Sequence, residues 1–177
     1  MSSSAMPPED ELPVIAFANR LPVRRTRNSW RLSDGGLVSA LQPAMRSRGG
    51  IWVGWDGGTQ TPREVPGLDF ELRPVSLSRR EVDAYYHGFA NRTLWPLLHG
   101  LVEQPTFDRF SWDVYRRVNE HFADVDDPSQ PGLRWVHDYH LLLLPGLLRR
   151  REALGRNPLM RASVLAPCNR LLRRKSR

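Results

Sequence analysis

Cysteine is nearly absent from this chain, and so are the residue clusters that hold metals. The 177 residues include one cysteine, Cys168, which cannot form a disulfide within the chain. No group of cysteines and histidines has the spacing of zinc ligands, and the chain lacks a P-loop and a Ser/His/Asp nucleophile elbow. We therefore expect no metal, no cofactor and a reducing, cytoplasmic location.

Long apolar runs are also missing. The longest, residues 141–148, is interrupted by Pro145 and Gly146 and is far too short to cross a bilayer. Residues 1–12 are polar and partly acidic, without the basic and apolar regions of a signal peptide. The sequence thus predicts a disordered leader over residues 1–12 and no membrane partner.

The net charge of +7 is concentrated at one end of the sequence. Residues 149–177 hold ten basic residues and one acidic residue, whereas the remaining 148 hold 16 basic and 18 acidic ones. A few solvated arginines explain this tail, so we expect no nucleic-acid partner. The tail also contains the only lysine and is rich in Arg, Ala, Pro and Leu, as in a GC-rich gene read out of frame. We treat residues 152–177 as a divergent basic tail and hypothesise that a frameshift near residue 152 truncates the chain.

Strand-like and helix-like segments alternate along residues 13–151. Short runs rich in β-branched and aromatic residues predict strands at 13–18, 51–55, 70–75 and 132–136. Apolar residues at helical spacing predict helices at 36–45, from Ser78 onward, and at 94–102, 107–123 and 141–151. Residues 23–34 are basic and aperiodic, which indicates a loop or hairpin. The alternation predicts an α/β fold with a mostly parallel sheet and flanking helices.

Several polar residues stand where strands end or helices begin. Arg20 follows the first expected strand, where ligands bind in open α/β sheets, and its guanidinium can hold a phosphate or simply be solvated. Gly35 and Gly36 open the next expected helix, a place that favours an anion, although a tight turn explains the same pair. Asp138 follows a later strand and can accept hydrogen bonds from sugar hydroxyls or cap a helix.

Aromatic residues gather in two further segments. Trp52 and Trp55 fall on opposite faces of one strand, so one can join the core while the other faces a ligand such as a sugar ring. Residues 85–96 combine Tyr86 and Trp95 with His, Asn and Arg in an expected loop-to-helix stretch. This stretch fits a ligand site and an aromatic core patch equally well.

Six segments within residues 14–151 read FANRLPV, DGGLVSAL, IWVGWDG, YYHGFANRTLWPLLH, FSWDVYRRVNEHFAD and WVHDYHLLLLPGLLRRR. In order and spacing they resemble the successive motifs of the trehalose-6-phosphate synthase family of retaining glycosyltransferases. Each motif alone is a weak signal, but six in order are specific. The family has the GT-B fold, two Rossmann-like domains facing across a cleft, and residues 13–151 are expected to form the first, acceptor-binding domain.

The resemblance implies transfer of glucose from a nucleoside diphosphate glucose, with UDP-glucose expected, to glucose 6-phosphate. By resemblance, Arg20 grips the phosphate of glucose 6-phosphate. Three aromatic residues complete the acceptor pocket: Trp55, Tyr86 and Trp95. Gly35 and Gly36 lie under the donor phosphates, and Asp138 is the catalytic position that contacts the sugars near the reacting carbon.

The chain departs from the family after residue 151. A His-Ile-Pro-Phe-Pro-like block is expected there and is absent, as are the second domain and its Arg/Lys clamp on the leaving group. We therefore expect a weakly active or inactive form with an exposed cleft and an unpaired sheet edge beside its last strand. A non-catalytic sugar-phosphate binding fragment and a degenerate remnant are the alternatives, and a homo-oligomer is left open.

Overall fold

The computed structural model describes residues 11–27, 29–58, 65, 67–101, 104–155 and 160–163. The leader expected over residues 1–12 and the tail expected over residues 152–177 therefore lie largely outside the described residues. Cys168 lies outside them as well.

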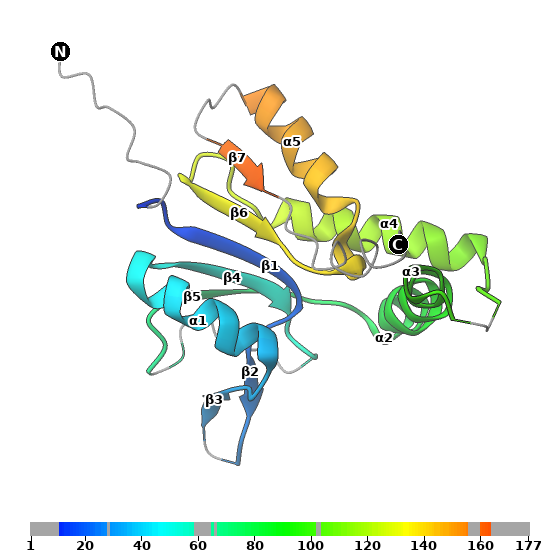
Figure 1. The fold of residues 1–177 in the computed structure, drawn as a ribbon, viewed down its shortest axis with the longest axis horizontal. Coiled ribbons are helices and arrows are strands. Elements are labelled where there is room, and N and C mark those ends of the chain that lie inside the picture. Colours follow the sequence, from blue (N-terminus) through cyan, green and yellow to red (C-terminus); the bar gives the residue numbers. More distant parts are fainter. Residues whose placement is uncertain are drawn as a thin grey trace, which may run out of the picture.

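Five parallel strands form the main sheet, in the order β5-β4-β1-β6-β7 (Figure 1). These strands are β1 (Val14–Arg20), β4 (Gly50–Trp55), β5 (Glu71–Val75), β6 (Gly132–Val136) and β7 (Met160–Ser163). The first four coincide with the strands that the sequence predicts, which confirms the α/β fold. A separate antiparallel hairpin, β2 (Val23–Arg25) and β3 (Trp30–Leu32), follows β1 where a loop or hairpin was expected.

The edge strand β7 corrects one expectation. The sequence predicts that the strand at 132–136 is the last one and that its outer edge is unpaired. Instead, β7 pairs with β6 in parallel, with Gly132 opposite Met160 and Trp135 opposite Ser163. Residues 160–163 therefore add a strand to the sheet beyond the last family motif.

Helices cover both faces of this sheet (Figure 1). They are α1 (Gly36–Arg48), α2 (Arg79–Val82), the π-helix η1 (Asp83–Leu94), α3 (Trp95–His99), α4 (Arg109–Asp124), the 3-10 turn η2 (Tyr139–Leu141) and α5 (Leu144–Gly155). Ser78 begins α2 with the predicted capping box, because its hydroxyl accepts from the Glu81 N–H and its own N–H donates to the Glu81 carboxylate.

The stretch at 85–96 is helical throughout, which corrects the loop-to-helix expectation. α2, η1 and α3 follow one another without a break, and twelve of their residues have π-helical hydrogen bonding. Gly88 faces α4 here, and a Cβ at that position would lie 2.8 Å from the Ser111 hydroxyl oxygen. The missing side chain therefore lets η1 approach α4, and the wider turn of the π-helix changes which side chains point inward.

The two faces of the sheet belong to separate cores. Phe17 and Val53 face the core that contains η1, α4 and α5, whereas Ala16 and Trp52 face the core that contains α1. Trp55 packs at the margin of the first core, so the two tryptophans of β4 lie on opposite faces as predicted.

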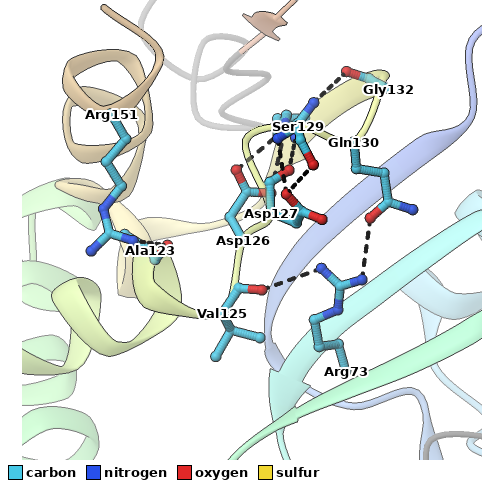
Figure 2. A network of polar contacts seen from close by, with 10 residues as sticks. Arg73, Ala123, Val125, Asp126, Asp127, Ser129, Gln130, Gly132 and Arg151 are labelled. Atoms are coloured by element: carbon cyan, nitrogen blue, oxygen red, sulfur yellow. Dashed lines mark hydrogen bonds and ion pairs between the residues drawn. The ribbon is translucent and has the colours of Figure 1, made fainter. Parts of the chain in front are cut away.

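A polar network fixes the loop that leads from α4 into β6 (Figure 2). Arg134 is fully buried on β6, where its guanidinium donates to the carbonyls of Gly132 and Asp127 and lies 3.4 Å from the buried Asp126 carboxylate. Arg73 on β5 donates to the Val125 carbonyl of the same loop, at 3.2 Å. These contacts hold β6 in register, and the chain leaving β6 carries Asp138.

Candidate functional site

The candidate site lies where the direction of the strand order reverses. From β1 the chain proceeds outward to β4 and β5, and then returns to the other side of β1 to form β6 and β7. In open α/β sheets, ligands bind beyond the carboxyl ends of the strands at such a switch point. Arg20 ends β1, and Asp138 lies two residues beyond the end of β6, so the topology places both beside this crevice.

A β-bulge aims Arg20. Phe17 pairs with Val53, but three residues later Arg20 pairs with Trp55, which is only two residues after Val53. The extra residue on β1 brings Arg20 to the same face of the sheet as Trp55. Gly54 permits the bulge, since a Cβ there would lie 2.5 Å from the Arg20 carbonyl carbon.

The Arg20 guanidinium lies against two aromatic rings. Its central carbon is 4.5 Å from the centre of the Trp55 ring and 5.9 Å from that of Tyr86. The Trp52 indole N–H donates to the Arg20 carbonyl at 3.1 Å, which fixes the backbone beneath it. Within the described residues no carboxylate pairs with this guanidinium, so its donors remain available to an anion.

A pocket of about 360 Å³ opens beside Arg20. Arg20, Tyr86 and Asp138 line it together, and the other lining residues are Ala18, Asn19, Leu21, Pro22, Ser33, Leu37, Val38, Trp52, His137 and His140. The volume is in the range of small-ligand sites. A guanidinium, a carboxylate and apolar walls are therefore available to a single ligand.

Asp138 adopts an unusual backbone conformation, with φ of 75°. It is the only non-glycine residue with positive φ among the described residues, and such conformations concentrate at functional sites. Its carboxylate accepts a hydrogen bond from the Tyr139 N–H at 2.7 Å. Burial alone would raise the pKa of Asp138, but the His140 imidazole, the Tyr139 N–H and the charge of His137 outweigh it and lower that pKa.

A series of ring contacts connects the pocket to Trp95. Tyr86 stacks on His140 with ring centres 5.3 Å apart, His140 lies 4.1 Å from Tyr139, and Tyr139 lies 5.5 Å from Trp95. Tyr139 also donates to the Asn91 side-chain oxygen at 3.0 Å. Burial and the nearby charge of Asp138 raise the pKa of Tyr139 to about 12, so this hydroxyl stays protonated and can donate at neutral pH.

The predicted residues thus fall into two groups. Arg20, Tyr86 and Asp138 line one pocket, and Trp55 lies directly under the Arg20 guanidinium. Trp95 is 41% exposed and does not line the pocket. It contacts the group only through the ring of Tyr139.

The glycine pair lies next to the pocket without lining it. Gly35 is the N-cap of α1 and Gly36 its first residue, while Leu37 and Val38 of the same turn line the pocket. A Cβ at Gly36 would meet nothing within 4 Å, so no described protein atom requires glycine there. The open space leaves room for a ligand to approach the N–H groups of this helix end.

Reasoning from the sequence missed the residues that support the site from behind. Tyr85 is fully buried, and its hydroxyl donates to the Asn19 side-chain oxygen at 3.0 Å, which ties η1 to the end of β1. His140 lines the pocket although only Asp138 of its motif was selected. The polar tips of Tyr85, in the aromatic segment 85–96, and of His140, beside Asp138, were the available signal, because buried polar atoms need partners.

Comparisons with known proteins identify the family and the fold. Residues 12–155 match the model of Glycosyltransferase family 20. The trehalose-6-phosphate synthase of Mycobacterium avium (strain 104) is 42% identical over 147 residues, which cover 76% of this chain and 30% of that protein.

Two solved structures have the same fold over most of this chain. An alpha,alpha-trehalose-phosphate synthase (UDP-forming) from Burkholderia vietnamiensis is 32% identical, with a TM-score of 0.62 over 87% of this chain and 31% of that one. The corresponding enzyme from Burkholderia xenovorans, in complex with glucose-6-phosphate, is 28% identical, with a TM-score of 0.63 over 87% of this chain and 32% of that one. The chain therefore spans about a third of the length of these relatives.

Neither a membrane-spanning helix nor a three-residue metal cluster occurs among the residues that the structure describes. The fold is the Rossmann-like N-terminal half of a GT-B glycosyltransferase. With its family motifs, sheet order and strand-end pocket in agreement, the chain belongs to glycosyltransferase family 20.

Proposed function

We propose that this chain supplies the acceptor half of an alpha,alpha-trehalose-phosphate synthase, which transfers glucose from UDP-glucose to glucose 6-phosphate. The observation that carries the proposal is the unpaired Arg20 guanidinium beside an aromatic-walled pocket that also holds the Asp138 carboxylate. The relative from Burkholderia xenovorans in complex with glucose-6-phosphate, and the UDP-forming one from Burkholderia vietnamiensis, support the two substrates.

Each part of glucose 6-phosphate has a complementary group in this pocket. The phosphate dianion suits the Arg20 guanidinium, which can form two parallel hydrogen bonds with it. The C–H faces of the sugar suit the rings of Tyr86 and, beside the pocket, Trp55 and Trp95. The Asp138 carboxylate suits the sugar hydroxyls at the far side, where transfer would occur, and its lowered pKa keeps it an acceptor at neutral pH.

The donor would lie above the N-terminus of α1. Gly35 and Gly36 leave space for its diphosphate, and the positive end of the helix dipole stabilises negative charge on the leaving group. The basic clamp of the family is not among the motifs of this chain. We therefore propose that the chain alone is weakly active or inactive, and that a second Rossmann-like half completes the reaction.

A non-catalytic sugar-phosphate binding fragment is the second candidate. Its support is the share of the relatives that the chain spans, about a third, together with a pocket that residues of this chain line. The two candidates agree on the pocket and differ only in turnover. An assay of UDP release with both substrates separates them, and rapid turnover by this chain alone would contradict the proposed need for a second half.

Calorimetric titration with glucose 6-phosphate tests the acceptor site. We expect Arg20→Ala to weaken binding by about 10–150-fold, because hydrogen bonds to charged groups contribute roughly 1.5–3 kcal/mol. Arg80→Ala, on the exposed surface of α2, is the matched control and should bind like the wild type. Glucose without the phosphate should show little dependence on Arg20. Equal affinity of the two variants would contradict the assignment of the phosphate to Arg20.

A further inference from the structure

His140 is a buried histidine that lines the pocket. Neither the sequence motifs nor the proposed function gives it a role. It is 5% exposed and lies between the rings of Tyr86 and Tyr139. Its backbone is held as well, because the Asn119 side chain on α4 donates to the His140 carbonyl at 3.2 Å. The imidazole is therefore confined in both position and orientation.

One nitrogen of this imidazole faces the Asp138 carboxylate. The Nδ1 atom of His140 lies 3.4 Å from Oδ2 of Asp138, while the other carboxylate oxygen accepts from the Tyr139 N–H. The His140 contact is longer than a usual hydrogen bond and misses its geometry. Such contacts often tighten when a ligand binds.

The other nitrogen has no hydrogen-bond partner among the described residues, although it is buried. Since Asp138 supplies the nearest charged acceptor, at Nδ1, a proton on Nδ1 is the arrangement that the surroundings favour. A buried ring nitrogen left without a partner costs free energy, so packing alone would favour an apolar ring at this position. The imidazole is thus better explained by its contact with Asp138.

Among the described residues, the other titratable side chains around Asp138 do not hydrogen-bond to its carboxylate. His137 acts on the carboxylate only through its charge, and the Tyr85 and Tyr139 hydroxyls donate to Asn19 and Asn91 instead. Arg20 lines the same pocket and pairs with no described carboxylate. His140 is therefore the side chain placed to orient Oδ2 of Asp138.

We propose that His140 is a positioning residue that fixes the orientation of the Asp138 carboxylate at the pocket wall. Two donors contact the Asp138 carboxylate, the Tyr139 N–H at 2.7 Å and the His140 imidazole at 3.4 Å, and together they set the direction of its side chain. The consequence for sugar binding rests on the proposed function, whereas the orientation itself does not.

A matched pair of substitutions tests this role. In His140→Asn the amide nitrogen lies as far from the backbone as Nδ1 does, so it can still donate to Asp138. In His140→Gln the amide lies where Nε2 was and cannot. Both variants are polar and uncharged and lack the imidazole ring, so the loss of the ring contacts affects both of them. The Asp138 carboxyl is followed by carbon-13 NMR during a pH titration without any ligand.

We expect His140→Gln to raise the pKa of Asp138 by about one unit or more, because only the Tyr139 N–H and the charge of His137 then oppose the effect of burial. His140→Asn should restore most of the lowered value. Equal titrations in both variants, whether shifted together or unshifted, would overturn the proposal. Affinity for glucose 6-phosphate is measured separately. Failure of the wild type to bind it would refute the proposed function. The carboxyl titration would still decide the role of His140, because it uses no ligand.

Discussion

The buried Arg134–Asp126 pair should be the most sensitive polar contact in the fold. Both side chains are almost fully buried, at 1% and 2% exposure. Replacement of Arg134 by Met keeps an unbranched side chain but leaves a buried carboxylate without its cation and two carbonyls without their donor. Breaking such a pair from one side costs about 3–5 kcal/mol. For a domain of this size the melting temperature should fall by roughly 6–20 °C.

The pH dependence identifies the cause of this loss. Burial raises the pKa of Asp126, and the Arg134 charge opposes the rise. In Arg134→Met the folded carboxyl therefore binds a proton at a higher pH than the unfolded one does. Between those two pKa values the folded state holds more protons, so its stability increases as the pH falls. The deficit relative to wild type should shrink as the pH falls from neutral toward the ordinary carboxyl pKa of about 4.

Urea unfolding of the chain at several pH values, followed by circular dichroism, measures both effects. Addition of Asp126→Asn to the Arg134→Met variant should recover at least about 1 kcal/mol, since the unpaired charge is removed. A deficit below about 0.5 kcal/mol at neutral pH, or one that does not change with pH, would refute the reasoning.

Three further substitutions test local structure through thermal unfolding and ligand binding. Ser78→Ala removes the capping box of α2 and should cost about 1 kcal/mol, whereas Arg80→Ala on the exposed surface of the same helix should cost less. Gly36→Ala should stabilise α1 by about 0.5–1 kcal/mol because the added methyl meets no described atom, and a loss of stability would contradict the open space seen there. Gly54→Ala should destabilise the folded state by about 1–3 kcal/mol, since the added Cβ would displace the Arg20 backbone. The same displacement should weaken glucose 6-phosphate binding. Unchanged binding would show that the bulge does not aim Arg20.

The parallel sheet was predictable because its strands are short apolar runs bounded by polar turns. The strand at 51–55 also revealed its two faces, since Trp52 and Trp55 are separated by an odd number of positions and lie in different cores. The capping box at Ser78 was also predictable, because it depends only on Ser78 and on Glu81 three residues later. Strand β7 was not, because its four residues, Met-Arg-Ala-Ser, do not form an apolar or β-branched run.

The site was predictable residue by residue but not as an arrangement. Arg20 was placed at a strand end by pattern alone, yet its position over the Trp55 ring depends on a β-bulge that no local motif announces. The continuous helix through residues 85–96 was also hidden, because Gly88 and the polar residues around it suggest a loop. Packing against α4 overrides that preference, and it determines which aromatic rings reach the pocket.

The central claim is that a sugar phosphate occupies the pocket beside Arg20. The most direct measurement is a nitrogen-15 NMR titration of the six tryptophan indole signals with glucose 6-phosphate. We predict that the Trp55 signal shifts, because the Arg20 guanidinium 4.5 Å above its ring gains a new partner, while the signal of Trp112 on α4 stays in place. The Trp55 shift should vanish in Arg20→Ala. A titration that leaves Trp55 unmoved, or moves it equally without Arg20, would contradict the account.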